Sequence, residues 1–216
     1  MVWKGETQSW EVLDGLDPVM VQKNSGAVYV SHNASYELNC LRAKIKVYMR
    51  DRNIQGSPDA GERLVMGLGD LSRLSILQYL TKASDLPLSE ELVRPSDLSG
   101  GDIFLRGTHI LPLVSFAEYF SSNPDALLQA GERLGAVRCE YGDIALQLKP
   151  FARIPVVVIL WLGDEEFPAA ASLLFDASCT LHLSTDILWS TAMITLEMLL
   201  SEAGAFEHCE FIKLPD

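Results

Sequence analysis

The first candidate site in the sequence is the polar segment Gly107-Thr108-His109, which stands directly before an expected helix over about 112–120. Backbone N–H groups at the start of a helix attract anions, and the Thr108 hydroxyl and His109 imidazole would add side-chain donors. The alternative is structural: Gly107 turns the chain, Thr108 caps the helix, and His109 is a satisfied residue at the edge of the fold. The sequence leaves both interpretations open.

The second candidate site follows the most apolar stretch of the chain, Ile154 to Leu162. The segment Gly163–Pro168 comes directly after it and carries three consecutive acids, Asp164, Glu165 and Glu166. Loops at the end of a rigid strand commonly hold ligands, and adjacent carboxylates can coordinate a hard cation or orient a basic substrate group. A solvated turn is the alternative, but the neighbouring aromatic residue and proline favour a packed turn.

Our hypothesis is that both segments face one pocket, with Arg153 and Asp176 on its wall. Asp176 follows a short expected strand and Asp143 lies in an expected hairpin turn, so both acids would reach the same edge. A buried carboxylate needs a cation, a donor or a metal, and Arg153 and His109 are suitable partners. The predicted ligand-binding residues are Thr108, His109, Arg153, Asp164, Glu165 and Asp176.

Motifs for nucleophilic or nucleotide chemistry are absent from the sequence, which has no Gly-x-Ser-x-Gly, P-loop or Gly-x-Gly-x-x-Gly pattern. The four histidines are scattered and suggest no metal cluster. No two cysteines form a C-x-x-C pair, so we expect four free thiols with no disulfide and no bound cluster. The cysteines are Cys40, Cys139, Cys179 and Cys209.

The first half of the chain predicts helices around an antiparallel hairpin. A helical arm is expected over about 10–25, where Asp17-Pro18 supplies a cap and a first-turn proline and Gly26 a stop. Alternating apolar and polar residues predict two hairpin strands between Ala27 and Met49. Three further segments follow: a loop over 51–61, an amphipathic helix over 70–83, and a short apolar strand over 103–105.

The second half is more apolar, and Ile154 to Leu162 should be an interior strand covered on both faces. Helices and strands do not alternate as they would in βαβ units. We therefore expect one α+β domain over 1–216, a mostly antiparallel sheet with helices packed on it. The other expected elements are helices over 112–120, 124–135 and 187–202, and strands over 137–141, 144–148 and 172–175.

The charge balance narrows the classes of partner. The 216 residues include 17 lysines and arginines against 29 acids, a net charge of −12. Nucleic acids and anionic membrane surfaces are therefore disfavoured. Met1 to Trp10 lacks a basic region followed by an apolar run, so we expect no signal peptide and a cytoplasmic protein. The slightly positive mean hydropathy suggests apolar surface covered by a protein partner or a second copy.

Several of these segments together resemble an uncharacterised domain family of bacteria and archaea. The likeness rests on residues 142–145, 150–155, 160–168 and 174–176, and Trp161-Leu162-Gly163-Asp164-Glu165-Glu166-Phe167-Pro168 is its most specific part. Members often carry a cysteine-rich module similar to the iron–sulfur domain of corrinoid proteins, and occur with corrinoid-dependent one-carbon metabolism. This chain has no such cysteine run, so the resemblance implies a tetrapyrrole or corrinoid only as a bound ligand or through a partner.

Two functions of different classes remain open at this point. The first is a non-catalytic accessory or ligand-binding module linked to anaerobic corrinoid or one-carbon metabolism. The second is a small metal-assisted enzyme that uses the Asp164-Glu165-Glu166 turn, with His109 as a further candidate. The sequence identifies no particular cofactor and does not decide whether the protein is an enzyme.

Overall fold

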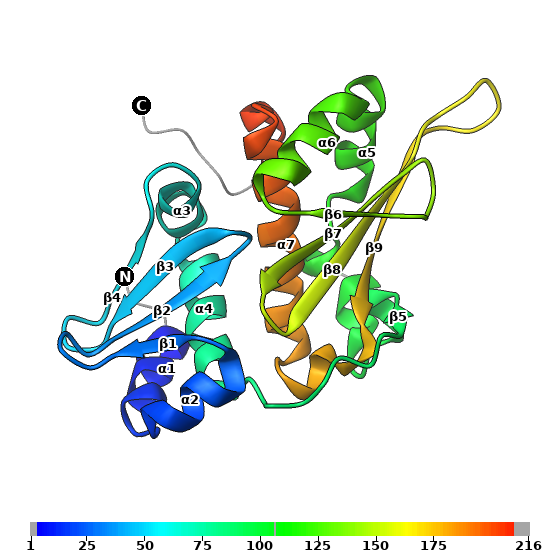
Figure 1. Cartoon of the computed structure of the whole chain (residues 1–216). Coiled ribbons are helices and arrows are strands. Elements are labelled where there is room, and N and C mark those ends of the chain that lie inside the picture. Colours follow the sequence, from blue (N-terminus) through cyan, green and yellow to red (C-terminus); the bar gives the residue numbers. More distant parts are fainter. Residues whose placement is uncertain (1–3, 106, 210–216) are drawn as a thin grey trace.

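The computed structural model describes residues 4–105 and 107–209 as two antiparallel sheets with helices packed against them (Figure 1). This confirms the predicted α+β class with antiparallel strands. The strands form two sheets where one was expected, because the hairpin of the first half meets the second sheet only end-on. The Leu41 N–H donates to the Lys149 carbonyl oxygen at 3.3 Å across this junction.

The first sheet contains the predicted hairpin and has the strand order β1-β2-β3-β4. Tyr36, Leu38 and Cys40 are buried, as the alternating pattern indicated. The expected loop over 51–61 is partly wrong, because its short polar segment pairs with β3 through backbone hydrogen bonds that no apolar pattern announces. The strands are β1 (Val28–Val30), β2 (Ser35–Cys40), β3 (Ala43–Tyr48) and β4 (Asn53–Gly56).

Two helices replace the single arm that was expected before this sheet. The Asp17 carboxylate accepts a hydrogen bond from the Val19 N–H at 2.9 Å, and Gly26 ends the second helix with φ = 73°. The residues before Trp10 are also helical, because Glu6, Ser9 and Trp10 are buried against the fold. The helices of this half are α1 (Lys4–Asp14), α2 (Pro18–Ser25), α3 (Ala60–Glu62) and α4 (Asp70–Lys82), with a π-helical turn at Arg63–Gly67.

The second sheet has the order β5-β9-β8-β7-β6, which confirms the predicted interior strand. Seven of the eight residues of β8, from Ile154 to Leu160, are buried, so this strand is covered on both faces. The strands are β5 (Leu92–Val93), β6 (Val137–Cys139), β7 (Ile144–Phe151), β8 (Ile154–Trp161) and β9 (Ala170–Asp176).

The predicted helices of the second half are present, but the strand expected at Ile103 is wrong. Gly101–Leu105 forms a 3₁₀ turn (η3), because this short apolar segment lies between two loops and packs as one tight helical turn. The helices are α5 (Leu113–Ser122), α6 (Pro124–Arg133) and α7 (Thr185–Glu202), and further 3₁₀ turns are η2 (Pro95–Asp97), η4 (Gly107–His109), η5 (Ala177–Leu181) and η6 (Phe206–His208).

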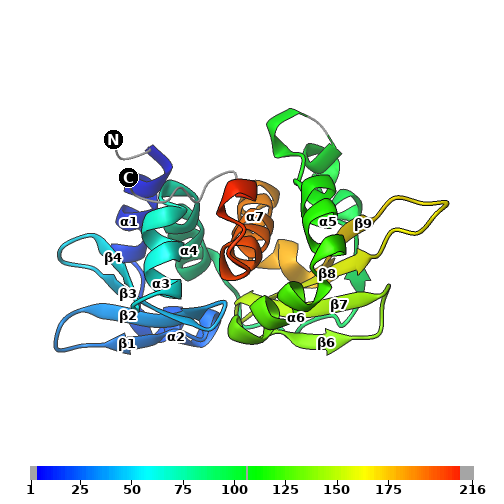
Figure 2. The same cartoon turned by 90° about the horizontal axis from the view of Figure 1, so that it is seen from above.

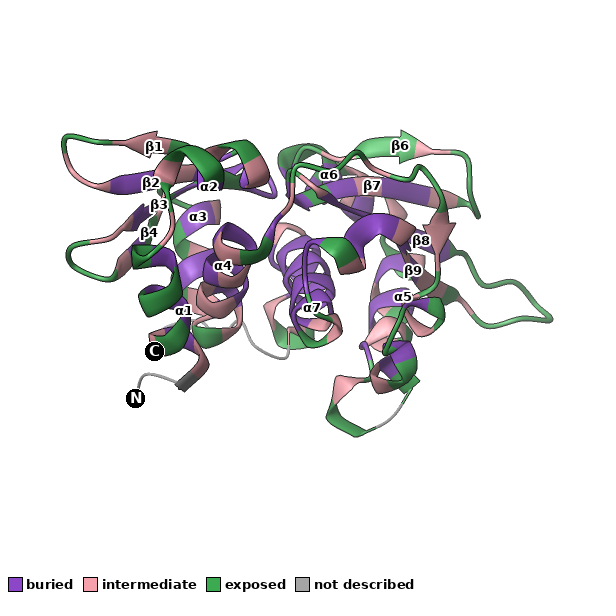
Figure 3. Ribbon diagram, turned by 90° about the horizontal axis from the view of Figure 1, so that it is seen from below, coloured by how far each residue is buried: buried purple, intermediate pink, exposed green. Residues whose placement is uncertain are grey.

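Helix α7 lies between two halves of the molecule (Figure 2). The first half is the β1–β4 sheet with helices α1 to α4, and the second half is the β5–β9 sheet with helices α5 and α6. Every residue from Ile187 to Ser201 except Trp189 is buried, and the helix contacts α4, α6 and β7 (Figure 3). The Thr191 and Thr195 hydroxyls donate to the carbonyl oxygens four residues earlier, at 2.8 and 2.9 Å. These bonds satisfy two hydroxyls that would otherwise be costly to bury.

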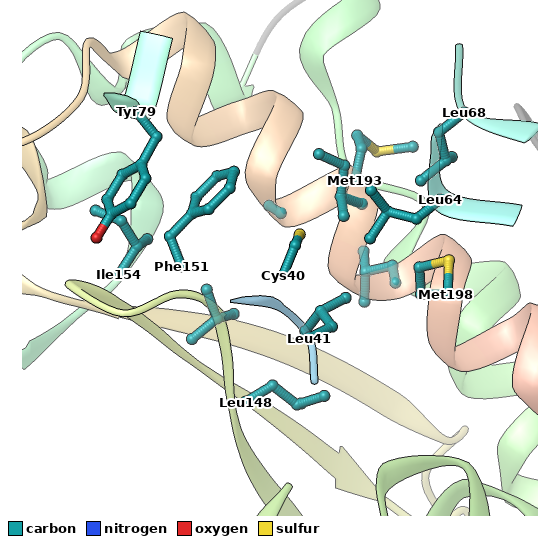
Figure 4. Packing of buried hydrophobic residues seen from close by; sticks show 14 of the residues in the cluster. Cys40, Leu41, Leu64, Leu68, Tyr79, Leu148, Phe151, Ile154, Met193 and Met198 are labelled. Carbon is teal, nitrogen blue, oxygen red and sulfur yellow. The ribbon is translucent and has the colours of Figure 1, made fainter. Parts of the chain in front are cut away.

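One apolar core joins both sheets to this helix. The tip of the β2–β3 hairpin inserts Cys40 and Leu41 beside Leu148 and Phe151 of β7 (Figure 4). Met193 and Met198 of α7 belong to the same core. The two halves are therefore packed against a shared interior.

The four cysteines are free thiols, with Cys40 and Cys179 buried. Burial is the main cause that raises the pKa of the Cys179 and Cys209 thiols to about 12. Both thiols are therefore protonated at neutral pH and poor nucleophiles. Within the described residues, no helix has both the length and the apolar character required to cross a bilayer.

Shortening one buried side chain of α7 should show how strongly the packing of this helix stabilises the fold. Leu199→Ala removes a fully buried side chain and should lower the free energy of unfolding by about 3 kcal/mol. Leu181→Ala is the control, because Leu181 is 58% exposed and its loss should change stability by less than about 0.5 kcal/mol. Urea unfolding of both variants measures the difference, and equal losses would contradict the central role of α7.

Candidate functional site

Thr108 and His109 lie in the 3₁₀ turn η4, separated from the following helix. Helix α5 begins at Leu113 with Pro112 at its N-cap, and no side chain caps it. Ile110 to Pro112 stand between this polar pair and the first turn of α5, so neither side chain caps the helix, and the anion site predicted there stays a prediction. Thr108 is exposed and His109 is half-buried.

His109 instead forms one wall of a cavity with Trp189 of α7. The two rings meet edge to face, with centroids 4.8 Å apart and planes inclined by 70°. The cavity, which we call the His109–Trp189 pocket, has a volume of about 630 Å³. It lies where α1, α4, η4 and α7 meet, and its lining residues are Glu6, Leu68, Asp70, Leu71, Leu74, Thr108, His109, Trp189 and Ser190.

Three leucines from the start of α4 and its preceding turn give this pocket an apolar wall opposite Trp189. Its charged groups are carboxylates. Glu6 is buried, and its Oε1 accepts hydrogen bonds from Arg73 Nη2 at 2.6 Å and from Trp10 Nε1 at 3.3 Å. Asp70 is exposed at the rim. Because Arg73 offsets the charge of Glu6, the Asp70 carboxylate and the aromatic face are what favour an uncharged or cationic ligand with an apolar body.

The glycine pair at the start of η3, Gly100 and Gly101, has a packing role. A Cβ on Gly101 would lie 2.2 Å from the Pro95 carbonyl oxygen, so no larger residue fits there. Gly100 has φ = 76°, and the neighbouring Ser99 carbonyl accepts a hydrogen bond from Thr185 Oγ1 at 2.7 Å. These contacts hold the first turn of α7 against the loop and explain the glycines without a ligand.

The acidic turn forms the exposed tip of the β8–β9 hairpin (Figure 1). Asp164 Oδ1 accepts hydrogen bonds from the backbone N–H groups of Phe167 and Glu166, at 2.7 and 2.8 Å. These two bonds lower the pKa of Asp164. The carboxylate therefore shapes its own turn, while Glu165 is exposed. Among the described residues, no three histidine, cysteine or acidic side chains are close enough to hold a metal ion.

The strand register shows that the expected convergence of Arg153, Asp164 and Asp176 is wrong. Arg153 precedes the eight-residue strand β8 and Asp164 follows it, so roughly 25 Å of extended chain separates them. Phe175, next to Asp176, pairs with Val156 at the Arg153 end of the hairpin. Arg153 and Asp176 therefore share one end of the sheet, and the acidic turn lies at the other.

Arg153 joins the two halves of the molecule. Its guanidinium donates to the carbonyl oxygens of Asn24, Lys23 and Leu86 at 2.7, 3.1 and 3.1 Å. It also forms an ion pair with Asp85 at 2.6 Å. Two of the carbonyls are at the C-terminal end of α2, where a cation is favoured by the helix dipole. These bonds occupy the side chain in a structural role.

Asp176 holds the same connecting loop, residues 83–91, from the opposite side. Its carboxylate accepts hydrogen bonds from the Ser89 N–H and hydroxyl at 3.0 and 2.7 Å, and from the Glu90 N–H at 2.8 Å. Ser178 adds backbone and side-chain donors. Burial alone would raise the pKa of this carboxyl, but the hydrogen bonds from Ser178 and Ser89 outweigh it and lower the pKa to about 2.

His182 is a third support of the 83–91 loop, and its role was not anticipated from the sequence. Its Nδ1 accepts a hydrogen bond from the Ser84 N–H at 3.2 Å, and the ring is buried. Burial, followed by the charge of Arg153, lowers the pKa of His182. The residue is therefore neutral at physiological pH. An isolated histidine between apolar residues carries no sequence signal for such a contact.

The family of the chain follows from a comparison with known domains. Residues 17–198 match the family described as "Domain of unknown function (DUF3786)". The chain belongs to the DUF3786 family. The match runs from the cap of α2 into α7, so the DUF3786 domain contains both sheets and the 83–91 loop. No curated protein and no solved structure matches the chain.

The structure places the six residues that the sequence predicted to bind a ligand in three separate regions of the DUF3786 domain. Thr108 and His109 line the His109–Trp189 pocket, Arg153 and Asp176 support the 83–91 loop, and Asp164 and Glu165 lie on the exposed hairpin tip. Trp189 and Glu6 were missed. Neither has a distinctive neighbour in the sequence, and only the packing of α1 and α7 brings them to the cavity.

Replacement of Asp176 should reveal its structural role through pH. Its pKa lies below the ordinary value of 3.8, so its stabilising effect is present above about pH 4 and is lost as the pH falls towards 2. Asp176→Asn should cost about 2 kcal/mol at neutral pH, and the gap from wild type should close in acid. Urea unfolding across this pH range, with Asp51→Asn at an exposed turn as control, measures the effect. A gap that does not change with pH would contradict this assignment.

Proposed function

We propose that this DUF3786 domain is a non-catalytic accessory module that binds a small ligand in the His109–Trp189 pocket. The observation that carries the proposal is a cavity of about 630 Å³ with an apolar wall, an aromatic face and few polar groups. Pockets of this size and character are typical of small-molecule sites. Its position between the two halves also favours binding, because ligand sites commonly lie at such junctions.

The ligand chemistry follows from the lining. Leu68, Leu71 and Leu74 favour an apolar body, and the Trp189 ring favours a flat one. The Asp70 carboxylate at the rim disfavours an anion, whereas the charge of Glu6 is offset by its ion pair with Arg73. A flat heteroaromatic base, neutral or positively charged, fits all of these groups.

The resemblance to corrinoid-associated domains supports a place for this module in corrinoid or one-carbon metabolism. The pocket volume suits a ligand of drug size, which is smaller than a complete corrinoid. We therefore propose that contact with a corrinoid is made through a partner protein. Size-exclusion chromatography with a purified corrinoid protein would test this part of the proposal separately, and no co-elution would remove it.

Binding of a simple aromatic probe tests the pocket itself. Benzimidazole should bind more tightly than benzoate, a ring of comparable size that carries a negative charge. Leu74→Trp should fill the pocket and abolish binding, and His109→Ala should weaken it about three- to tenfold through the lost ring contact. NMR titration measures the affinities.

His32→Ala is the matched control, because His32 is exposed in a turn of the first sheet and lies outside the pocket. Its affinity for benzimidazole should equal that of the wild type. A preference for benzoate, or equal binding by the Leu74→Trp variant and the wild type, would overturn the proposal.

A further inference from the structure

A second cavity lies on the other side of the junction between the two halves. It has a volume of about 520 Å³ and is bounded by the ends of α2, β2 and α6 and by strands β6 and β7. Lys149, one of its lining residues, accepts the backbone hydrogen bond from Leu41. We call this cavity the Arg42–Lys149 cleft. Its lining residues are Ser25, Gly26, Leu38, Asn39, Arg42, Tyr79, Leu134, Gly135, Val137, Gln147, Lys149 and Ala152.

The charge of this cleft is opposite to that of the whole protein. Arg42 and Lys149 line it, and no acidic residue among those the structure describes does, although the chain carries a net charge of −12. Within residues 4–105 and 107–209, neither cation has a carboxylate at ion-pair distance, whereas Arg63, Arg73, Arg133 and Arg153 all do. A concave site lined by one sign of charge concentrates ions of the other sign.

Side-chain amides complete the polar lining. Asn39 is on the β2 side of the cleft and Gln147 is on the β7 side. In the described part of the chain, neither amide has a hydrogen-bond partner, so both can donate to a ligand. Arg42 makes one long hydrogen bond, from Nη1 to the Glu132 carbonyl at 3.4 Å, which leaves most of its donors available.

The local backbone fixes the position of Arg42. Leu41 and Arg42 form the two-residue turn between β2 and β3, with φ of 47° and 69°. Leu41 enters the core, and the turn therefore directs Arg42 towards the cleft. Gly135 has φ = 79°, and a Cβ there would lie 3.3 Å from Arg42 Cδ. This glycine leaves room for the stem of the arginine.

We propose that the Arg42–Lys149 cleft binds a small anion with at least two negative charges on a polar body, such as a phosphate ester or a dicarboxylate. The guanidinium and the ammonium pair with the anionic groups, and the two amides donate to the remaining acceptors. This inference is independent of the His109–Trp189 pocket, which lies between other elements and disfavours anions.

Calorimetric titration of the full chain tests the cleft, with pyrophosphate and citrate as probes of the two anion types. At least one of them should bind in low-salt buffer. Arg42→Gly and Lys149→Gln should each weaken binding about tenfold or more, because each removes charge-assisted hydrogen bonds. The anion that binds more tightly identifies a phosphate or a carboxylate ligand.

Two matched controls lie on the next turn and strand. Arg52 is also an exposed arginine with positive φ (46°), so Arg52→Gly makes the same change of charge and backbone outside the cleft. Lys44→Gln matches the lysine variant in the same way. Both controls should keep wild-type affinity. Equal losses in the controls, or no binding of either anion by the wild type, would overturn the proposal.

Discussion

The burial of nearly all of α7 is the constraint on which the rest of the structure depends. A helix that is apolar on all sides must be covered all round, so neither sheet with its own helices can form a finished core alone. The first half supplies α4 and the tip of the β2–β3 hairpin, and the second half supplies α6 and β7. Both cavities lie at the junction that this shared helix creates, one bounded mainly by helices and the other by strand ends.

A second requirement is that the loop between the halves keeps a fixed path. Residues 83–91 lack regular structure, and their backbone groups need partners wherever they leave water. Three side chains supply these partners. Arg153 directly precedes β8, His182 directly follows η5, and Asp176 ends β9. Arg153 and Asp176, which were predicted to bind a ligand, thus stabilise the fold. The charge-assisted hydrogen bonds that would hold a ligand are here made to the backbone of the loop.

The sequence predicts the elements well where apolar and polar residues alternate, as for β2 and β3, and where a long run is apolar, as for β8 and α7. It fails for η3, where three apolar residues carry no period, and for β4, which pairs through its backbone. The candidate site was predicted only in part, because the length of β8 holds Asp164 far from Arg153. Arg42 and Lys149 were missed for another reason. They are 107 residues apart, and only the contact between two sheets brings them together.

The separation of α4 and α7 along the sequence affects synthesis on the ribosome. The face of α4 that α7 covers is complete once residue 82 has been made, yet its partner begins at residue 185. While residues 83–184 are being made, this face of α4 therefore lacks its intramolecular cover. Nascent chains in this condition associate readily with chaperones or with each other. The order of these elements thus makes the emergence of α7 the event that completes the shared core.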